Sequence, residues 1–200
     1  MKRTMTALIL LLLIWILPAA ALCESPGIPT IRETIAMEQP SFSFRGGIRW
    51  GMTPELVRSI ETEAMTEKSG EVWTVMVTAD PVAVSRFSAD LVFIFQNNAL
   101  KMITYEFYQD VSSLYYQYLI GALSSVYGDG QEAQPATVKA LMDLIYPGRF
   151  SLEKIRQPVV WTHADGTHIY LYYFTDTNYA ILYTSPGLGS QGGGYVVDGL

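Results

Sequence analysis

Apolar residues recur at intervals of three and four through residues 111–127, the strongest periodic signal in the 200-residue chain. Such spacing places side chains on one side of a helix. Asp110 precedes the run where a carboxylate can cap a helix, and Gly128 follows it where helices often end. The pattern predicts a helix with an aromatic stripe that packs into the core, formed by Val111, Leu114, Tyr115, Tyr118, Leu119, Ala122, Leu123, Val126 and Tyr127.

A second helix is predicted within the segment FRGGIRWGMTPELVRSIE, residues 44–61. The Thr53 hydroxyl can accept a free N–H of the first turn, and Pro54 follows at the first helical position, where its missing N–H costs nothing. We interpret the segment as a strand-to-helix connection in which Trp50 covers the edge of the core. The alternative is an anion-binding loop in which Arg45 and Arg49 contact an anion near the start of the helix.

Alternating apolar positions predict strands on both sides of the helix 111–127. The first set is EVWTVMVT, FSADLVFIF and LKMITYEFY, with the turn QNNA joining the last two as a hairpin. The second set is three antiparallel strands within residues 158–185, joined by Asp165-Gly166 and by TDTN. A weaker helix is predicted at PATVKALMDLIY, before Pro147-Gly148.

These elements predict an α+β fold, in which an antiparallel β-sheet has its helices packed on one face. The order is helix, three strands, helix, three strands. A degenerate internal duplication is an alternative interpretation of the same order.

Both faces of the last predicted hairpin are rich in large apolar side chains, whereas a sheet open to water on one side normally alternates with polar residues. Tyr170, Tyr172, Tyr183 and Trp161 are the candidates for contacting a partner, because aromatic residues are common at interfaces. The alternatives are that the second face is covered by another segment of the chain, by a second copy or by a ligand.

The two histidines flank the predicted Asp165-Gly166 turn. With a two-residue type I′ loop, His163 lies directly opposite His168, and Trp161 and Tyr170 follow on the same face. A histidine pair can bind zinc or copper, but a complete site usually needs three or four ligands. The pair is therefore a weak metal candidate, and we expect both side chains at the surface or the rim.

Signatures of enzymatic chemistry are otherwise missing from the sequence. It contains no G-x-S-x-G, no H-E-x-x-H, no phosphate loop and no dinucleotide-binding glycine pattern. We name no catalytic residue, expect no cofactor, and favour a non-enzymatic role. The formal net charge is −6 without a basic cluster, which argues against binding to nucleic acid.

The N-terminus predicts export. Lys2 and Arg3 precede an apolar run from Ala7 to Leu17, and Pro18 and small residues follow, as in a secretory signal peptide. Cleavage after Ala21 or after Cys23 is consistent with the small residues there. We expect a signal peptide over 1–23, a linker over 24–41, an α+β domain over 42–185 and a mobile glycine-rich tail over 186–200. An uncleaved anchor, or a lipid on Cys23, is the alternative.

Residues Trp50, Gly51, Thr53, Glu55 and Val57 fit a W-G-x-[ST]-x-E-x-V pattern. This stretch resembles the helix-start motif of small secreted or lipid-anchored bacterial α+β proteins. The order of elements is similar to that of the outer-membrane-assembly small lipoprotein module and of the β-lactamase-inhibitor repeat. The resemblance implies a non-catalytic envelope module and transfers no functional residue. The single cysteine, which excludes an internal disulfide, and Leu22 before Cys23 depart from many of those relatives.

The sequence thus favours an exported binding or interaction module, secreted or located in the cell envelope, that contacts another protein or an envelope component. Contact with a membrane is expected only through the signal peptide or a lipid on Cys23. The alternatives are a small extracytoplasmic hydrolase whose site is assembled from dispersed residues, and a structural lipoprotein.

Overall fold

A computed structural model describes residues 41–108, 113–148, 150–175 and 178–188. All of them belong to the unit Pro40–Leu200. The predicted signal peptide, the linker up to residue 40, the tail from residue 189 and the Asp110 cap lie outside the described residues. The predictions made for those segments therefore stay predictions.

The described residues form one antiparallel sheet. Its order is β1-β2-β4-β5-β9-β8-β7-β6, and β3 pairs with β4 outside this path. The strands are β1 (Met65–Ser69), β2 (Trp73–Thr78), β3 (Val82–Val84), β4 (Phe87–Gln96), β5 (Ala99–Phe107), β6 (Gln131–Glu132), β7 (Arg156–Thr162), β8 (His168–Thr175) and β9 (Asn178–Thr184).

The sheet order is symmetrical about its centre. The four strands β1-β2-β4-β5 follow helix α3 (Pro54–Ile60), and the four strands on the other side follow helix α4 (Ser113–Tyr127). The halves join through their last strands, β5 and β9, which pair antiparallel. This arrangement is the one that a duplication would produce, although β3 and helix α5 (Pro135–Asp143) break the symmetry. Five strands rather than the predicted three separate α3 from α4. The two additional strands give a weak apolar pattern, because β1 is largely exposed and β3 has only three residues.

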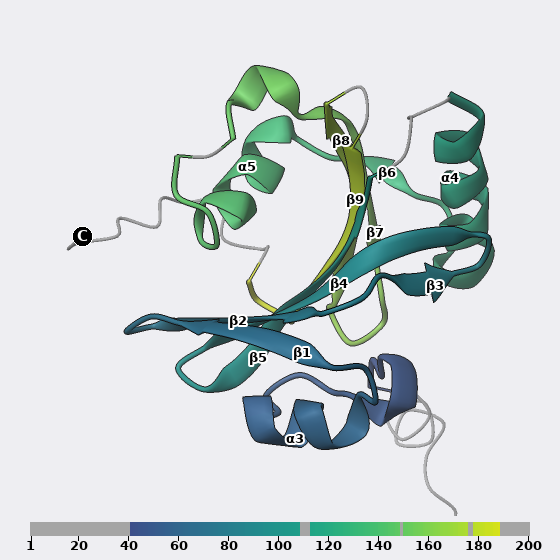
Figure 1. Cartoon of the computed structure of the whole chain (residues 1–200). Helices are drawn as coiled ribbons and strands as arrows, with labels where there is room; N and C mark the ends of the chain where they lie inside the picture. The colour runs from purple at the N-terminus through teal and green to yellow at the C-terminus, as the bar shows by residue number, and fades with distance from the viewer. Residues whose placement is uncertain (1–40, 109–112, 149, 176–177, 189–200) are drawn as a thin grey trace, which may run out of the picture. The chain divides into compact units, whose positions relative to one another are not determined.

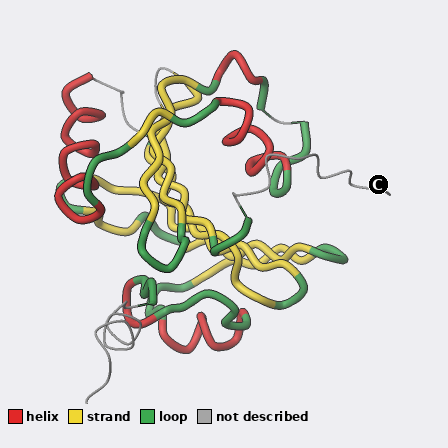
Figure 2. The backbone as a smooth tube through the Cα atoms, turned by 180° about the vertical axis from the view of Figure 1, so that it is seen from behind, coloured by secondary structure: helices red, strands yellow, loops and turns green. Residues whose placement is uncertain are grey.

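The α+β class with an antiparallel sheet is confirmed, but the helices cover both faces rather than one. One apolar layer contains Val57 of α3 and Leu119 of α4, together with strand residues such as Phe93 and Leu171. The other layer contains Val138 and Leu141 of α5. Figures 1 and 2 show α4 and α5 on opposite sides of strands β7, β8 and β9.

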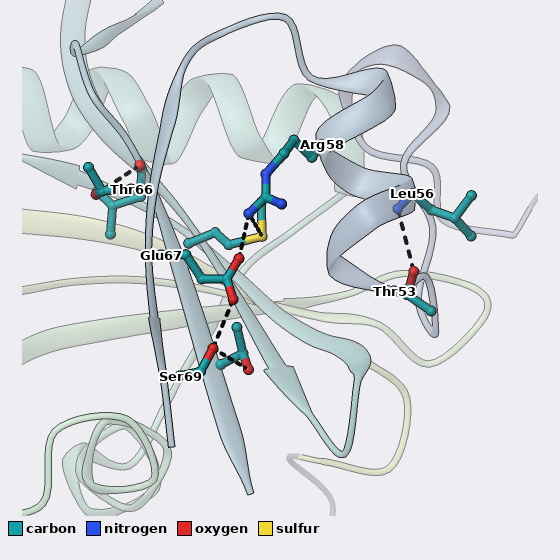
Figure 3. Close-up of polar contacts among 9 residues, drawn as sticks. Thr53, Leu56, Arg58, Thr66, Glu67 and Ser69 are labelled. Carbon is teal, nitrogen blue, oxygen red and sulfur yellow. Dashed lines mark hydrogen bonds and ion pairs between the residues drawn. The ribbon is translucent and has the colours of Figure 1, made fainter. Parts of the chain in front are cut away.

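The predicted helix start at Thr53 is confirmed. Thr53 Oγ1 accepts the N–H of Leu56 at 3.4 Å, and Pro54 occupies the first helical position. The next turn of α3 carries Arg58, which forms an ion pair with Glu67 of β1 (Figure 3). Glu67 in turn accepts the hydroxyl of Ser69 at 2.8 Å. The cap and the ion pair together fix α3 against the edge of the sheet.

The register of the β7–β8 hairpin differs from the prediction by one residue. The N–H of His163 donates to the carbonyl of Thr167 at 2.8 Å, which leaves a three-residue loop, 164–166. Only Gly166 of this loop has a positive φ, of 88°, whereas a type I′ turn needs two such residues. Trp161 therefore pairs with Ile169 and Thr162 pairs with His168. A one-residue slip exchanges the faces of a strand, so Trp161 and Tyr170 point to opposite sides.

Candidate interaction surface

The four aromatic residues predicted to contact a partner are buried in the chain itself. Tyr170 and Tyr172 lie in the α5-side layer, 3% and 0% exposed, and the Tyr172 hydroxyl donates to Met142 Sδ at 2.8 Å. Trp161 and Tyr183 lie in the α4-side layer, 1% and 7% exposed. Burial raises the pKa of Tyr172 and of Tyr183 well above the usual tyrosine value. The partner-binding assignment of these residues was wrong, because segments of the same chain cover both faces of the hairpin.

The arginines predicted to contact an anion have different surroundings. Arg45 Nε lies 3.0 Å from the carboxylate of Glu61, whose side chain is almost completely buried. This ion pair gives Arg45 a structural role, since an unpaired buried carboxylate would destabilise the fold. Arg49 is exposed. Nothing in the described residues makes the two side chains a common anion site.

The two histidines lie on opposite sides of the sheet. The ring of His168 stacks near Tyr170 on the α5 side, and burial lowers its pKa. His163 lies beside Phe42 and Tyr127, which belong to the α4-side layer. No group of three or more histidine, cysteine, aspartate or glutamate side chains suited to a metal occurs in the described part of the chain. The predicted cross-strand histidine pair is therefore wrong.

His163 is joined instead to a carboxylate, because its Nδ1 lies 2.9 Å from Asp165 Oδ1. The same carboxylate accepts the N–H of Phe42 at 2.7 Å and the N–H of Thr167 at 2.9 Å. Partial burial alone would raise the pKa of Asp165, but these donors hold that pKa at about 2. Thr167 is fully buried, and its Oγ1 accepts the indole N–H of Trp50 at 2.8 Å. The contacts anchor residues 42–50 on the hairpin and leave the Thr167 hydroxyl engaged and inaccessible to a substrate.

Helix α4 presents the most unusual surface of the described residues. None of its fifteen residues is charged. Its inner side is fixed to the sheet, since the Tyr116 hydroxyl donates to the carbonyl of Leu171 at 3.1 Å and the Trp161 indole donates to Ser124 at 3.3 Å. Its outer side, named here the α4 face, comprises Leu114, Tyr115, Gln117, Tyr118, Gly121, Ala122, Ser125 and Val126.

Several side chains of the α4 face are large, apolar and open to solvent. Leu114 is 73% exposed and Val126 71%, while Tyr115 and Tyr118 are 36% and 38% exposed. The predicted stripe was therefore only partly correct: Leu119 and Leu123 are core, but these four residues are not. A helix that is apolar all round is normally buried on all sides. No helix of the described segments has the length and hydrophobicity to cross a membrane.

The β3–β4 turn borders the α4 face and fixes its tyrosines. The Arg86 guanidinium lies 4.5 Å from the centre of the Tyr118 ring, and Ser85 Oγ lies 3.2 Å from the Tyr118 hydroxyl. Hydrogen bonds from Ser85 and Arg86 lower the pKa of Tyr118. The Phe87 ring lies 5.3 Å from that of Tyr115. The aromatic groups are thus held in place before any partner binds, which reduces the entropy lost on binding.

The sequence contained a usable signal for this surface. The periodicity assigned the wide stripe 111–127 to the core. A buried stripe does not explain why the opposite side of the helix also has no charged residue.

Comparisons with known proteins found no relatives: no protein-family model, no curated protein and no solved structure matches the chain.

Proposed function

We propose that this chain is an exported, non-catalytic binding module that engages a protein partner through the α4 face. The observation that carries the proposal is the solvent-exposed, uncharged outer side of α4. Cores of protein interfaces are depleted in charged residues and enriched in tyrosine and arginine. The α4 face has this composition, with Tyr115 and Tyr118 at its centre and Arg86 at its border.

Three further features support an exported module. The N-terminal apolar run has the form of a signal peptide, and the net charge of −6 favours solubility. The symmetrical sheet with one helix before each half agrees with the resemblance of residues 50–57 to small envelope proteins of bacteria. On this basis the proposed location is the cell envelope or the extracellular space.

The proposal is tested by placing a photoreactive amino acid at position 114 of the full chain in its native host. Position 56 is the matched control, because Leu56 is an apolar residue that is 51% exposed on α3. We expect cross-linked species from position 114 and none from position 56. Equal absence of adducts at both positions would overturn the proposal.

A small hydrolase remains the second candidate, and the 2.9 Å contact between His163 and Asp165 is the observation that favours it. In a hydrolase this pair would activate a nucleophile or a water molecule. Turnover of p-nitrophenyl acetate by the purified chain, abolished by His163→Gln while the melting temperature is kept, would establish this function in place of the first.

A further inference from the structure

We infer that the occupant of the α4 face is a second copy of this chain, with the two α4 helices packed antiparallel about a two-fold axis. The inference rests on the proposed function and specifies its partner. A two-fold interface uses the same surface on both copies, so that surface must be complementary to itself. The α4 face meets this condition in shape and in charge.

The complementarity in shape comes from the distribution of large and small residues. Leu114, Tyr115 and Tyr118 occupy the first half of the α4 face, and Gly121, Ala122 and Ser125 occupy the second half. In an antiparallel pair centred on position 120, positions whose numbers sum to 240 lie at the same height along the helix axes, and those on the α4 face meet. Tyr118 then meets Ala122, and Tyr115 meets Ser125. A Cβ atom added at Gly121 would meet nothing within 4 Å, so this part of the helix is open to close approach.

The two most exposed large apolar residues of the described chain also pair under this register. Leu114 and Val126 sum to 240, so the ends of the interface are closed by aliphatic contacts between the copies. In a parallel pair, by contrast, Tyr118 would meet Tyr118 and Ala122 would meet Ala122. The two tyrosine rings would then overlap, and the two alanine side chains would leave a void between the helices.

Charges at the border favour the same antiparallel orientation. Arg86 lies against Tyr118, beside the first half of α4, and the exposed Asp129 follows the last residue of the helix by two positions. The antiparallel arrangement brings Arg86 of each copy to the half of the other helix that leads to Asp129, whereas a parallel pair would place it beside the opposite half. The helix dipoles are also antiparallel in this arrangement. The overall charge of −6 opposes contact between copies elsewhere, so an uncharged face bordered by a cation is where self-association is least opposed.

The interface is limited mainly to one helix of fifteen residues and the adjacent turn. Small interfaces form weak complexes, so we expect a dissociation constant on the order of 10 μM. The experiment is sedimentation velocity of the purified full chain between about 1 and 200 μM, a range that brackets this value. We expect the sedimentation coefficient to rise with concentration, Ala122→Glu to abolish the rise, and Leu56→Glu to leave it unchanged.

A charge exchange tests the orientation. Arg86→Glu and Asp129→Lys each place like charges together, so each variant alone should dimerise at least about tenfold more weakly. Mixed in equal amounts, they should associate again, since one contact becomes Glu with Lys and the other remains Arg with Asp. A general loss of folding in either variant would not produce this recovery. If the mixture fails to associate, the antiparallel pair is overturned.

The outcomes separate this inference from the proposed function. The wild-type chain could stay monomeric at every concentration while position 114 still cross-links to a different protein. That result overturns self-association through the α4 face and retains the binding module. Sedimentation with phosphatidylglycerol vesicles that is lost in Leu114→Glu assigns the α4 face to a membrane surface and overturns both. Absence of every adduct together with a monomeric chain also overturns both.

Discussion

Helices α4 and α5 cover opposite faces of the same sheet, but only α5 has the surface of an ordinary solvent-exposed helix. The nine residues of α5 bury Val138, Leu141 and Met142 and carry an ion pair between Lys139 and Asp143 on the partly exposed side. The fifteen residues of α4 bury a comparable stripe and carry no charge at all. Burial against the sheet therefore explains the apolar inner side of both helices, whereas the uncharged outer side of α4 requires a different explanation.

Three buried threonines on the two sides of the sheet differ in how their hydroxyls are satisfied. Thr104 and Thr184 alternate with residues of the α4-side layer, so they face α5, and the hydroxyls of both are buried without a hydrogen-bond partner. On the α4 side, Thr167 is equally buried but accepts a hydrogen bond from Trp50. We therefore expect removal of the Thr104 or Thr184 hydroxyl to stabilise the fold, and removal of the Thr167 hydroxyl to destabilise it.

The largest expected effect separates core aromatic residues from those of the α4 face. Trp161→Ala should lower the free energy of unfolding by about 3–5 kcal/mol, because the indole is almost fully buried beneath α4. Tyr118→Ala should cost less than about 1 kcal/mol, since its ring is partly exposed. Urea unfolding of the two variants is the measurement, and similar losses in both would erase the distinction between the inner and outer sides of α4.

The next effect concerns Asp165, which holds residues 42–50 on the α4 side. Its pKa is lowered from 3.8 to about 2 in the folded chain, so its contribution is present above pH 3.8 and is lost as the pH falls through 2. The full contribution corresponds to about 2 kcal/mol. Asp165→Asn should destabilise the chain at pH 7, and the difference from wild type should narrow below pH 3.8. A difference that stays constant from pH 7 to pH 2 would assign the loss to packing instead.

A smaller effect of opposite sign is expected on the α5 side. Thr104→Val and Thr184→Val each remove an unpartnered buried hydroxyl and keep the side-chain shape, so each should stabilise the chain by about 1 kcal/mol. Thr167→Val is the matched control and should destabilise it, because the indole N–H of Trp50 then loses its acceptor. Melting temperatures in one buffer would reveal the contrast. Destabilisation by all three substitutions would show that the hydroxyls of Thr104 and Thr184 do not cost stability in the folded chain.

The smallest effect on stability is expected on the α4 face itself. Leu114→Glu and Val126→Glu should change the free energy of unfolding by less than about 0.5 kcal/mol, since both side chains are more than two-thirds exposed. The same substitutions should weaken self-association in the sedimentation experiment. A large loss of stability in the monomer would indicate that these residues support the fold rather than an interface.

Local features of this fold were predictable from the sequence. The Thr53 cap, the helix end at Gly128, whose φ is 82°, and the turn at Asn97 and Asn98, both with positive φ, follow from single-residue chemistry. The register of β7 and β8 was not predictable, because Asp165-Gly166 fits a two-residue loop and a three-residue loop equally well. Because the prediction assumed the two-residue loop, it assigned the side chains of β7 to the wrong faces of the sheet. It therefore placed Trp161 on the same face as Tyr170, whereas the two side chains lie on opposite faces.

Contacts between segments that are distant in the sequence could not be predicted either. Asp165 accepts the N–H of Phe42 across 123 positions of sequence, and neither residue carries a local sign of the contact. The α4 face was misassigned for a different reason: periodicity reports that a helix has an apolar side, but it does not report whether the flanks of a wide stripe meet the sheet or the solvent. The absence of charge along 113–127 was the informative observation.

We expect the α4 face to be covered when the protein is in its native setting. Hydroxyl-radical footprinting with mass spectrometry tests it directly, by comparing the full chain in native extracts with the purified chain at high dilution. We expect Leu114 and Tyr118 to be protected in the native setting and oxidised on dilution, while Leu152, which is 47% exposed, is oxidised equally in both. Equal oxidation of Leu114 and Tyr118 in the two settings would show that nothing covers the α4 face.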